Sequence, residues 1–124
     1  MPLVRIDSTG TPIELLEKLG EAIHDALVEA IGIPADDRFQ VLSSGGSRVI
    51  ADPGYLGIRR DAGVVIVQVI LRSGRTVEQK KAFYGAVAEK AAAIGVEPRN
   101  ILITLVENDL PDWSFGDGVA QYVQ

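Results

Sequence analysis

The sequence predicts a single α/β domain (α+β in some schemes) built from two tandem β-α-β units, with a four-stranded mixed sheet and two helices on one face. Two helical stripes of apolar residues, each lying between short β-branched runs, indicate this order of elements. The run VVIVQVIL at residues 64–71 is too continuously apolar for a strand wetted on one side, and it predicts a central strand. A chain of 124 residues, 47% hydrophobic and 23% charged, has the composition of one globular domain.

Charge and composition exclude several classes of function. Asp and Glu number 17 against 12 Lys and Arg, so the formal net charge of -5 repels nucleic-acid backbones and anionic membranes. The chain has no cysteine, which excludes disulfides, thiolate metal sites and cysteine nucleophiles. The sequence starts without a secretory pattern, and no segment approaches the ~20 apolar residues of a membrane span. We therefore expect a cytoplasmic protein that binds neither nucleic acid nor membrane.

The amino-terminal part of the chain predicts a strand followed by a helix. Partial alternation at residues 3–7 is typical of a strand, which would begin almost at the amino end. We expect Thr11 to cap the helix and Pro12 to occupy its first position, with the helix ending at about Gly32. The apolar stripe of this helix consists of Ile13, Leu16, Leu19, Ile23, Ala26, Leu27, Ala30 and Ile31.

The remaining elements repeat this order. Residues 39–42 predict a second strand, and residues 43–63 predict a loop rich in Gly and Ser. The central strand at 64–71 is followed by a second helix over 76–95 and a fourth strand over 101–106. We interpret 64–71 as covered on both faces because its residues are apolar almost throughout.

The two halves of the chain indicate an internal duplication. An offset near 63 residues aligns hydrophobic positions between residues 2–62 and 63–124, which we read as pseudo-repeats within one domain over 1–124. Each half then contains two parallel strands joined by a right-handed helical crossover. Two helices can cover only one face of the sheet, so the apolar strands favour burial of the other face against further copies of the chain.

Several segments carry a resemblance to a known family. The start MPLVRID, with a proline directly after the first methionine, and the two β-α-β units resemble the tautomerase superfamily. The segments IPADDRFQ (33–40), GRTVEQK (74–80), VEN (106–108) and DWSFG (112–116) resemble the malonate semialdehyde decarboxylase family. The resemblance spans nearly the whole chain. It implies a homotrimer with active sites between sheet ends and subunit edges.

Pro2 is the residue whose chemistry depends on its position. At the end of a chain that has lost Met1, it is a secondary amine on a rigid ring, and it can act as a base, an acid or an iminium-forming nucleophile. An internal proline can do none of these. A simpler interpretation of the Met-Pro start alone is a residue that permits removal of methionine, and the resemblance favours the catalytic role.

The resemblance assigns further roles to charged and polar residues. Asp37 matches the acidic residue beside the family's proline, and a neighbouring carboxylate favours the protonated amine. Arg75 matches the arginine that grips the substrate carboxylate. Ser73 occupies the place of a second arginine, which Arg72 could replace, although neighbouring strand residues point to opposite faces. Without the resemblance, all four would be read as solvated turn or loop residues.

Trp113 and Phe115 match the apolar wall of the family's site, and alternation in a short strand would place both on one side. Aromatic burial at a subunit interface is the simpler interpretation of these two rings. His24 is the only histidine, so we expect a partly buried helix residue rather than a catalyst. The implied reaction requires neither a metal nor an organic cofactor.

The resemblance implies decarboxylation of malonate semialdehyde or a similar short 3-oxo acid, a carbon-carbon lyase reaction that uses Pro2. Keto-enol tautomerisation or hydration of a 2-oxo acid in the same pocket is an alternative, in which Pro2 is neutral and acts as a base. A non-catalytic trimeric binding module is an alternative of another class, because folds outlast their chemistry. In the enzymatic readings, the partner is a small oxo acid that bears a carboxylate.

Overall fold

A computed structural model describes residues 1–45 and 48–123. Residues 46 and 47 of the predicted loop lie outside the described residues. The regular elements are β1 (Pro2–Ser8), α1 (Ile13–Ala26), β2 (Phe39–Ser44), β3 (Val65–Arg72), α2 (Val77–Ala93) and β4 (Ile101–Asn108). The predicted elements are thus confirmed in kind and order, and β2 and β4 each extend two residues beyond the predicted ends.

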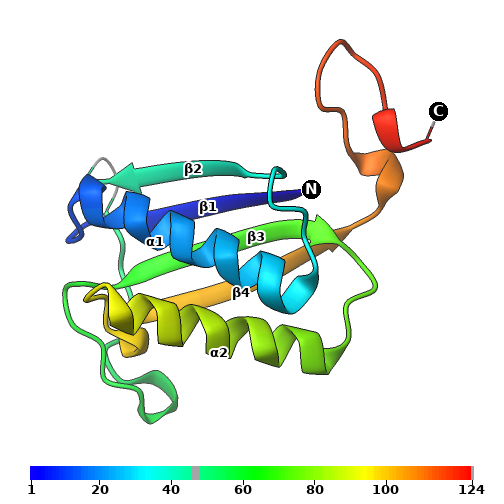
Figure 1. Cartoon of the computed structure of the whole chain (residues 1–124). Coiled ribbons are helices and arrows are strands. Elements are labelled where there is room, and N and C mark those ends of the chain that lie inside the picture. Colours follow the sequence, from blue (N-terminus) through cyan, green and yellow to red (C-terminus); the bar gives the residue numbers. More distant parts are fainter. Residues whose placement is uncertain (46–47, 124) are drawn as a thin grey trace.

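The four strands form one mixed sheet in the order β2-β1-β3-β4. Strand β1 pairs in parallel with β2, β3 pairs in parallel with β4, and β1 and β3 run antiparallel in the middle. Both helices cover one face of this sheet (Figure 1). The predicted four-stranded mixed sheet with two helices on one face is therefore confirmed.

The core lies between the sheet and the two helices. Alternate residues of β1 and β3, among them Val4, Ile6, Val67 and Val69, are buried under the helices because side chains of a strand alternate between faces. From α2, Phe83 is fully buried in the same cluster. None of the helices in the described part of the chain is long and apolar enough to cross a membrane.

The beginning of α1 differs from the prediction, whereas its end agrees with it. Pro12 occupies the N-cap position without a side-chain cap, because the hydroxyl of Thr11 is buried and accepts a hydrogen bond from Ser8 Oγ at 2.8 Å. The predicted cap at Thr11 is therefore wrong. At the other end, one turn of π-helix (Leu27–Ile31) continues the helix, and Gly32 stops it with a φ of 83° in the left-handed region.

The start of α2 agrees with the sequence. Thr76 is the N-cap, and its side chain accepts a hydrogen bond from the backbone N–H of Gln79 at 3.1 Å. The Gln79 side chain accepts a bond from the Thr76 N–H in return, which completes a capping box. Farther along the first turns of the helix, Lys80 forms an ion pair with Glu107 at the end of β4. These contacts fix the start of α2 and tie it to the end of β4.

The face of the sheet away from the helices is open within one chain. Strand pairing aligns Phe39, Leu3, Ile70 and Val106 in one row across this face, and Phe39 and Val106 are 49% and 41% exposed. The prediction that β3 is covered on both faces therefore holds for one face only, when a single chain is considered.

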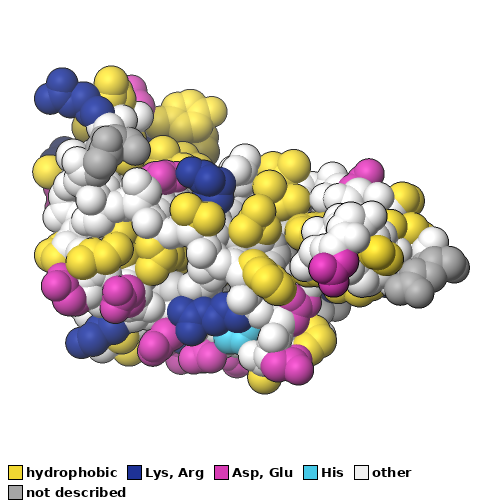
Figure 2. All heavy atoms as spheres, turned by 90° about the horizontal axis from the view of Figure 1, so that it is seen from above, with side chains coloured by type: hydrophobic (Ala, Val, Ile, Leu, Met, Phe, Trp, Pro, Cys, Tyr) yellow, Lys and Arg dark blue, Asp and Glu magenta, His cyan; other side chains and the backbone are white. Residues whose placement is uncertain are grey.

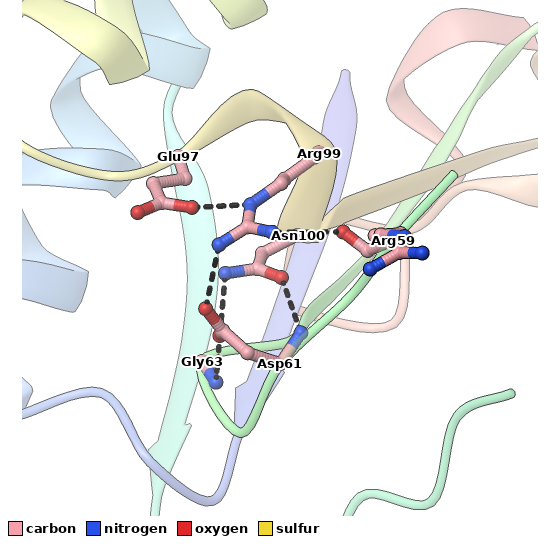
Figure 3. Close-up of polar contacts among 6 residues, drawn as sticks. All are labelled: Arg59, Asp61, Gly63, Glu97, Arg99 and Asn100. Atoms are coloured by element: carbon pink, nitrogen blue, oxygen red, sulfur yellow. Dashed lines mark hydrogen bonds and ion pairs between the residues drawn. The ribbon is translucent and has the colours of Figure 1, made fainter. Parts of the chain in front are cut away.

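The long loop before β3 is tied to the start of β4 by a polar cluster (Figure 3). Asn100 is 5% exposed, donates to Asp61 Oδ1 at 2.8 Å and accepts from the Asp61 N–H at 3.1 Å. Asp61 also accepts from the Gly63 N–H and from Arg99. The cluster lies at the end of the sheet opposite the chain's amino terminus.

Candidate active site

The residues singled out from the sequence come together at one end of the sheet. Figure 1 shows the amino terminus, the ends of β3 and β4, the loop that leads into β2 and the carboxyl-terminal segment at this end. They converge because β1 begins where the antiparallel β3 ends. Since β4 runs parallel to β3, it also ends there. The fold thus places Pro2 close to the loop 73–76 and to the segment after β4.

Pro2 is the first residue of an interior strand. It is buried, and it lies opposite Leu71 in the pairing of β1 with β3. The amino group of Met1 forms an ion pair with Asp37, and these side chains are only 11% and 17% exposed. The acid predicted to act on the amino terminus therefore already contacts the terminal nitrogen, one residue before Pro2.

A short loop holds Asp37. The loop follows the π-helical turn and Gly32, and the Asp37 N–H donates to the carbonyl of Pro34 at 3.1 Å, which closes a turn. His24 of α1 contacts the same loop, with Nε2 2.8 Å from the carbonyl oxygen of Ala35. His24 is 8% exposed, so it is a helix histidine, as predicted, and more deeply buried than the partial burial that was expected.

Arg75 lies in the loop between β3 and α2, after Gly74, whose φ of 107° favours glycine. Among the described residues, its buried Nε has no hydrogen-bond partner. Partial burial and then the positive charge of Arg75 lower the pKa of the Met1 amino group, whereas the ion pair with Asp37 acts in the opposite direction. Arg75 thus carries an unused donor close to the amino end of the chain.

Arg72 and Ser73 lie differently from Arg75. Strand β3 continues through Arg72, which is exposed and pairs with Asn108. By alternation Arg72 lies on the open face, opposite to Leu71. The Ser73 N–H donates to the carbonyl of Asn108 at 2.7 Å, so this residue fixes the strand end, and its side chain is half-buried.

The predicted aromatic pair is part of a larger cluster. The rings of Trp113 and Phe115 stack with centroids 5.6 Å apart and an interplanar angle of 7°. Phe115 also contacts Phe39 at 5.6 Å and Tyr122 at 5.2 Å. Alternation predicted a short strand here. The structure has no strand in this segment, which follows a 3-10 turn, Leu110–Asp112. Trp113 Nε1 donates to the Asn108 side chain at 2.8 Å, which fixes the ring at the end of β4.

Sequence reasoning missed two members of this aromatic cluster. Phe39 lies on the open face beside Leu3, one position along β1 from Pro2. Its place at the start of a predicted strand, two residues after Asp37, could have indicated from the sequence that it lies near the site. Tyr122 had no such signal, because the segment after β4 has no periodic pattern. Figure 2 shows hydrophobic side chains exposed on this carboxyl-terminal segment.

Cavities also lie on other parts of the surface. A cavity of about 260 Å³ lies between α2 and β4, and it is lined by Tyr84, Val87, Ala88, Pro98, Ile101 and Ile103. It contains no charged side chain and lies toward the start of β4, away from Pro2. Among the described residues, no group of three or more His, Cys, Asp or Glu side chains is close enough together to hold a metal ion.

Comparison with known proteins identifies the family. Residues 37–116 match the sequence pattern of a family described as tautomerase enzyme, and residues 2–43 match a second pattern with the same description. Together with the β-α-β fold and a proline in the second position, these matches show that the chain belongs to the tautomerase superfamily.

Within that superfamily, the chain is similar to particular proteins. It is 37% identical over the full length of both chains to the probable tautomerase YusQ of Bacillus subtilis (strain 168). It is 40% identical to the FG41 malonate semialdehyde decarboxylase inhibited by 3-bromopropiolate, over 99% of this chain and 94% of that chain, with a TM-score of 0.88. A second malonate semialdehyde decarboxylase, described as having decarboxylase and hydratase activities, is 38% identical over 98% and 95% with a TM-score of 0.85.

A more distant structure bears on assembly. Fused 4-OT, solved as a symmetric trimer, is 25% identical over 94% of each chain, with a TM-score of 0.71.

Proposed function

We propose that the chain, once Met1 is removed, decarboxylates malonate semialdehyde or a similar short 3-oxo acid without a cofactor. The observation that carries this proposal is that two opposite charges lie at the amino end of the chain. In the chain that retains Met1, Asp37 forms an ion pair with the Met1 amino group, and Arg75 is near enough to lower the pKa of that group; removal of Met1 would leave Pro2 as the amine between them. The similarity to two malonate semialdehyde decarboxylases supports the same reaction.

Arg75 is the proposed carboxylate receptor. A guanidinium can donate two parallel hydrogen bonds to a carboxylate, and the buried Nε of Arg75 has no partner within the described residues. The side chain of Ser73, at the entrance to the same loop, is half-buried and would contribute a hydroxyl. Arg72 is exposed and is given a smaller part in binding than Arg75, whose donor is buried.

Protonated Pro2 is the proposed electron sink. It polarises the substrate carbonyl by a hydrogen bond; alternatively, Pro2 first gives up its proton, attacks the carbonyl carbon as the neutral amine, and the adduct loses water to form a cationic iminium. The bond between the carboxylate carbon and its neighbour then breaks, carbon dioxide leaves, and the electron pair moves to the enol or enamine. Protonation of that carbon gives the aldehyde, and water releases it from an iminium. Asp37 keeps Pro2 charged and oriented.

The aromatic cluster would exclude water from the reacting carboxylate. Trp113 and Phe115 stack beside Phe39, which neighbours the start of β1. In a drier site, the charge of Arg75 and of Pro2 acts more strongly. Loss of a charged carboxylate as neutral carbon dioxide is favoured in such surroundings.

A tautomerase or hydratase reaction is the alternative, and the similarity to the probable tautomerase YusQ favours the tautomerase. In that reaction Pro2 must be neutral and act as a base. Asp37 favours the charged form of the terminal amine, whereas burial and Arg75 favour its neutral form. The reason to prefer decarboxylation is therefore the similarity to two malonate semialdehyde decarboxylases at 40% and 38% identity.

The proposed assembly is a homotrimer in which the open sheet faces are buried. The exposed row of Phe39, Leu3, Ile70 and Val106 supplies an apolar surface for a second copy. Fused 4-OT, which has the same fold, forms a symmetric trimer. Association of three copies would also cover the exposed apolar side chains of the carboxyl-terminal segment.

The test compares substrates with Met-free protein, whose amino terminus is verified by mass spectrometry. We expect a higher kcat/KM for malonate semialdehyde, followed as released carbon dioxide, than for phenylpyruvate, followed as keto-enol conversion. Pro2→Ala should lower turnover by at least ~100-fold while the circular dichroism spectrum stays the same. Full decarboxylation by a chain that retains Met1, or a preference for phenylpyruvate, would contradict the proposal.

A further inference from the structure

His24 makes a contact that neither its sequence context nor the proposed chemistry uses. Its Nε2 lies 2.8 Å from the carbonyl oxygen of Ala35. A carbonyl oxygen only accepts hydrogen bonds, so Nε2 must carry the proton and donate. The ring is 8% exposed, and the bond is therefore little weakened by competition with water.

Ala35 is in the turn that carries Asp37. The turn begins at Pro34 and is closed by the bond from the Asp37 N–H to the Pro34 carbonyl. Before the turn, Ile33 is anchored in the core with 4% exposure, and after it β2 begins at Phe39. His24 thus ties the middle of the exposed turn to α1, between these two anchors.

We infer that His24 is a positioning residue that, through the Ala35 carbonyl, holds the Asp37 carboxylate at the amino end of the chain, where it contacts the Met1 nitrogen and would contact Pro2 once Met1 is removed. The bond restrains the turn from rotating about its ends, and Asp37 is two residues from the restrained carbonyl. Without it, the carboxylate would be displaced from the nitrogen on average. This inference rests on the proposed role of Asp37 and Pro2.

The consequence is specific to the charge on Pro2. A carboxylate that is displaced favours the cationic amine less, so the pKa of Pro2 falls. As pH is raised, activity should then begin to decline at a lower pH than in the unmodified protein. Arg75 is on a different loop and would still bind the substrate carboxylate. Loss of His24 should therefore reduce kcat more than it raises KM.

The experiment uses three variants of the Met-free protein. His24→Leu removes the donor and replaces the ring with an apolar side chain of similar size. His24→Gln restores a donor, because the amide nitrogen of glutamine can occupy about the same place as Nε2. Ala22→Gly, in the same helix, changes a residue that borders Lys90 and Ala93 of α2 and lowers helix stability by ~1 kcal/mol. The pKa of Pro2 is measured by nitrogen-15 NMR titration, together with kcat and KM for malonate semialdehyde.

We expect His24→Leu to lower both the Pro2 pKa and kcat, the latter about tenfold with KM within about twofold. His24→Gln should recover most of both values, and Ala22→Gly should change neither. Asp37→Asn shows how far the Pro2 pKa falls when the carboxylate charge is removed altogether. If Asp37→Asn lowers the Pro2 pKa and His24→Leu does not, the role of His24 is wrong and the proposed function stands. If Asp37→Asn leaves that pKa unchanged, the role of Asp37 is wrong and that of His24 falls with it.

Discussion

The Met1 amino group and the Asp37 carboxylate form an ion pair at the start of an interior strand. The pair joins residues that are 36 positions apart in the sequence, because β1 and β2 run in parallel and the loop before β2 returns to the point where β1 begins. Any chemistry at the amino end of this chain therefore takes place beside a carboxylate.

The first prediction concerns the stability of the chain that retains Met1. Burial and Arg75 lower the pKa of its amino group, so between the folded and unfolded pKa values the unfolded chain binds more protons. The free energy of unfolding should then rise with pH across this interval. The stability gained from the amino group in this way should be lost as pH falls through the folded pKa. Urea unfolding midpoints between about pH 6 and pH 9 measure it.

An amino-terminally acetylated chain is the control, because it has no amino group to titrate. The difference between the two chains should depend on pH in this interval. Parallel curves for the two chains would show that the amino group has the same pKa in both states.

The second prediction separates the two arginines. Arg75→Ala should raise KM by about tenfold or more, because a charged hydrogen bond to a carboxylate is lost. Arg75→Lys should recover part of the affinity, since it keeps the charge without the two parallel donors. Arg72→Ala should have a smaller effect, because Arg72 is exposed on the open face. Steady-state kinetics of all three variants is the measurement, and equal effects of the two alanine variants would assign Arg72 to the pocket.

The third prediction tests the open sheet face. Val106→Asp places a charge within the proposed trimer interface, where desolvation is costly. We expect it to give a monomer by light scattering, with the circular dichroism spectrum unchanged.

Ile13→Asp is the matched control, because Ile13 is also 41% exposed but lies at the start of α1. It should remain a trimer. If both variants keep the wild-type mass, the open face is not the interface.

The fourth prediction concerns the cluster in Figure 3. Asn100→Ala should destabilise the protein by about 1–3 kcal/mol, because the Asp61 N–H and carboxylate lose a buried partner. Arg99→Ala removes exposed ion pairs of the same cluster and should destabilise the protein less than Asn100→Ala, because solvent screens exposed pairs. Chemical denaturation at pH 7 compares the two variants. A larger loss of stability in Arg99→Ala would contradict the conclusion that Asn100 is the more important member of the cluster.

The fold was largely predictable because its periodicities are simple. The alternation in β1 and the continuous apolar run of β3 correspond to strands with one and two apolar faces, and Thr76 with Gln79 forms the capping box that such a pair favours. These signals are local. They do not depend on which other element lies nearby.

The features that escaped prediction depend on contacts between distant residues. Thr11 cannot cap α1 because Ser8, at the end of β1, occupies its hydroxyl. The orientation of Arg72 follows from β3 continuing one residue farther than its apolar run. In the candidate site, Asp37 and Arg75 were identified by resemblance. The contributions of His24, Phe39 and Tyr122 arise from tertiary contacts that no short motif encodes.

The position of β1 between β2 and β3 has a practical consequence for handling the protein. A strand that is hydrogen-bonded on both sides cannot bend away from the sheet at its first residue, so anything joined ahead of Pro2 is directed toward the Asp37 carboxylate. A purification tag at that end would obstruct the pocket even after careful linker design. Fusions belong at the other terminus, with attention to the aromatic side chains just before it.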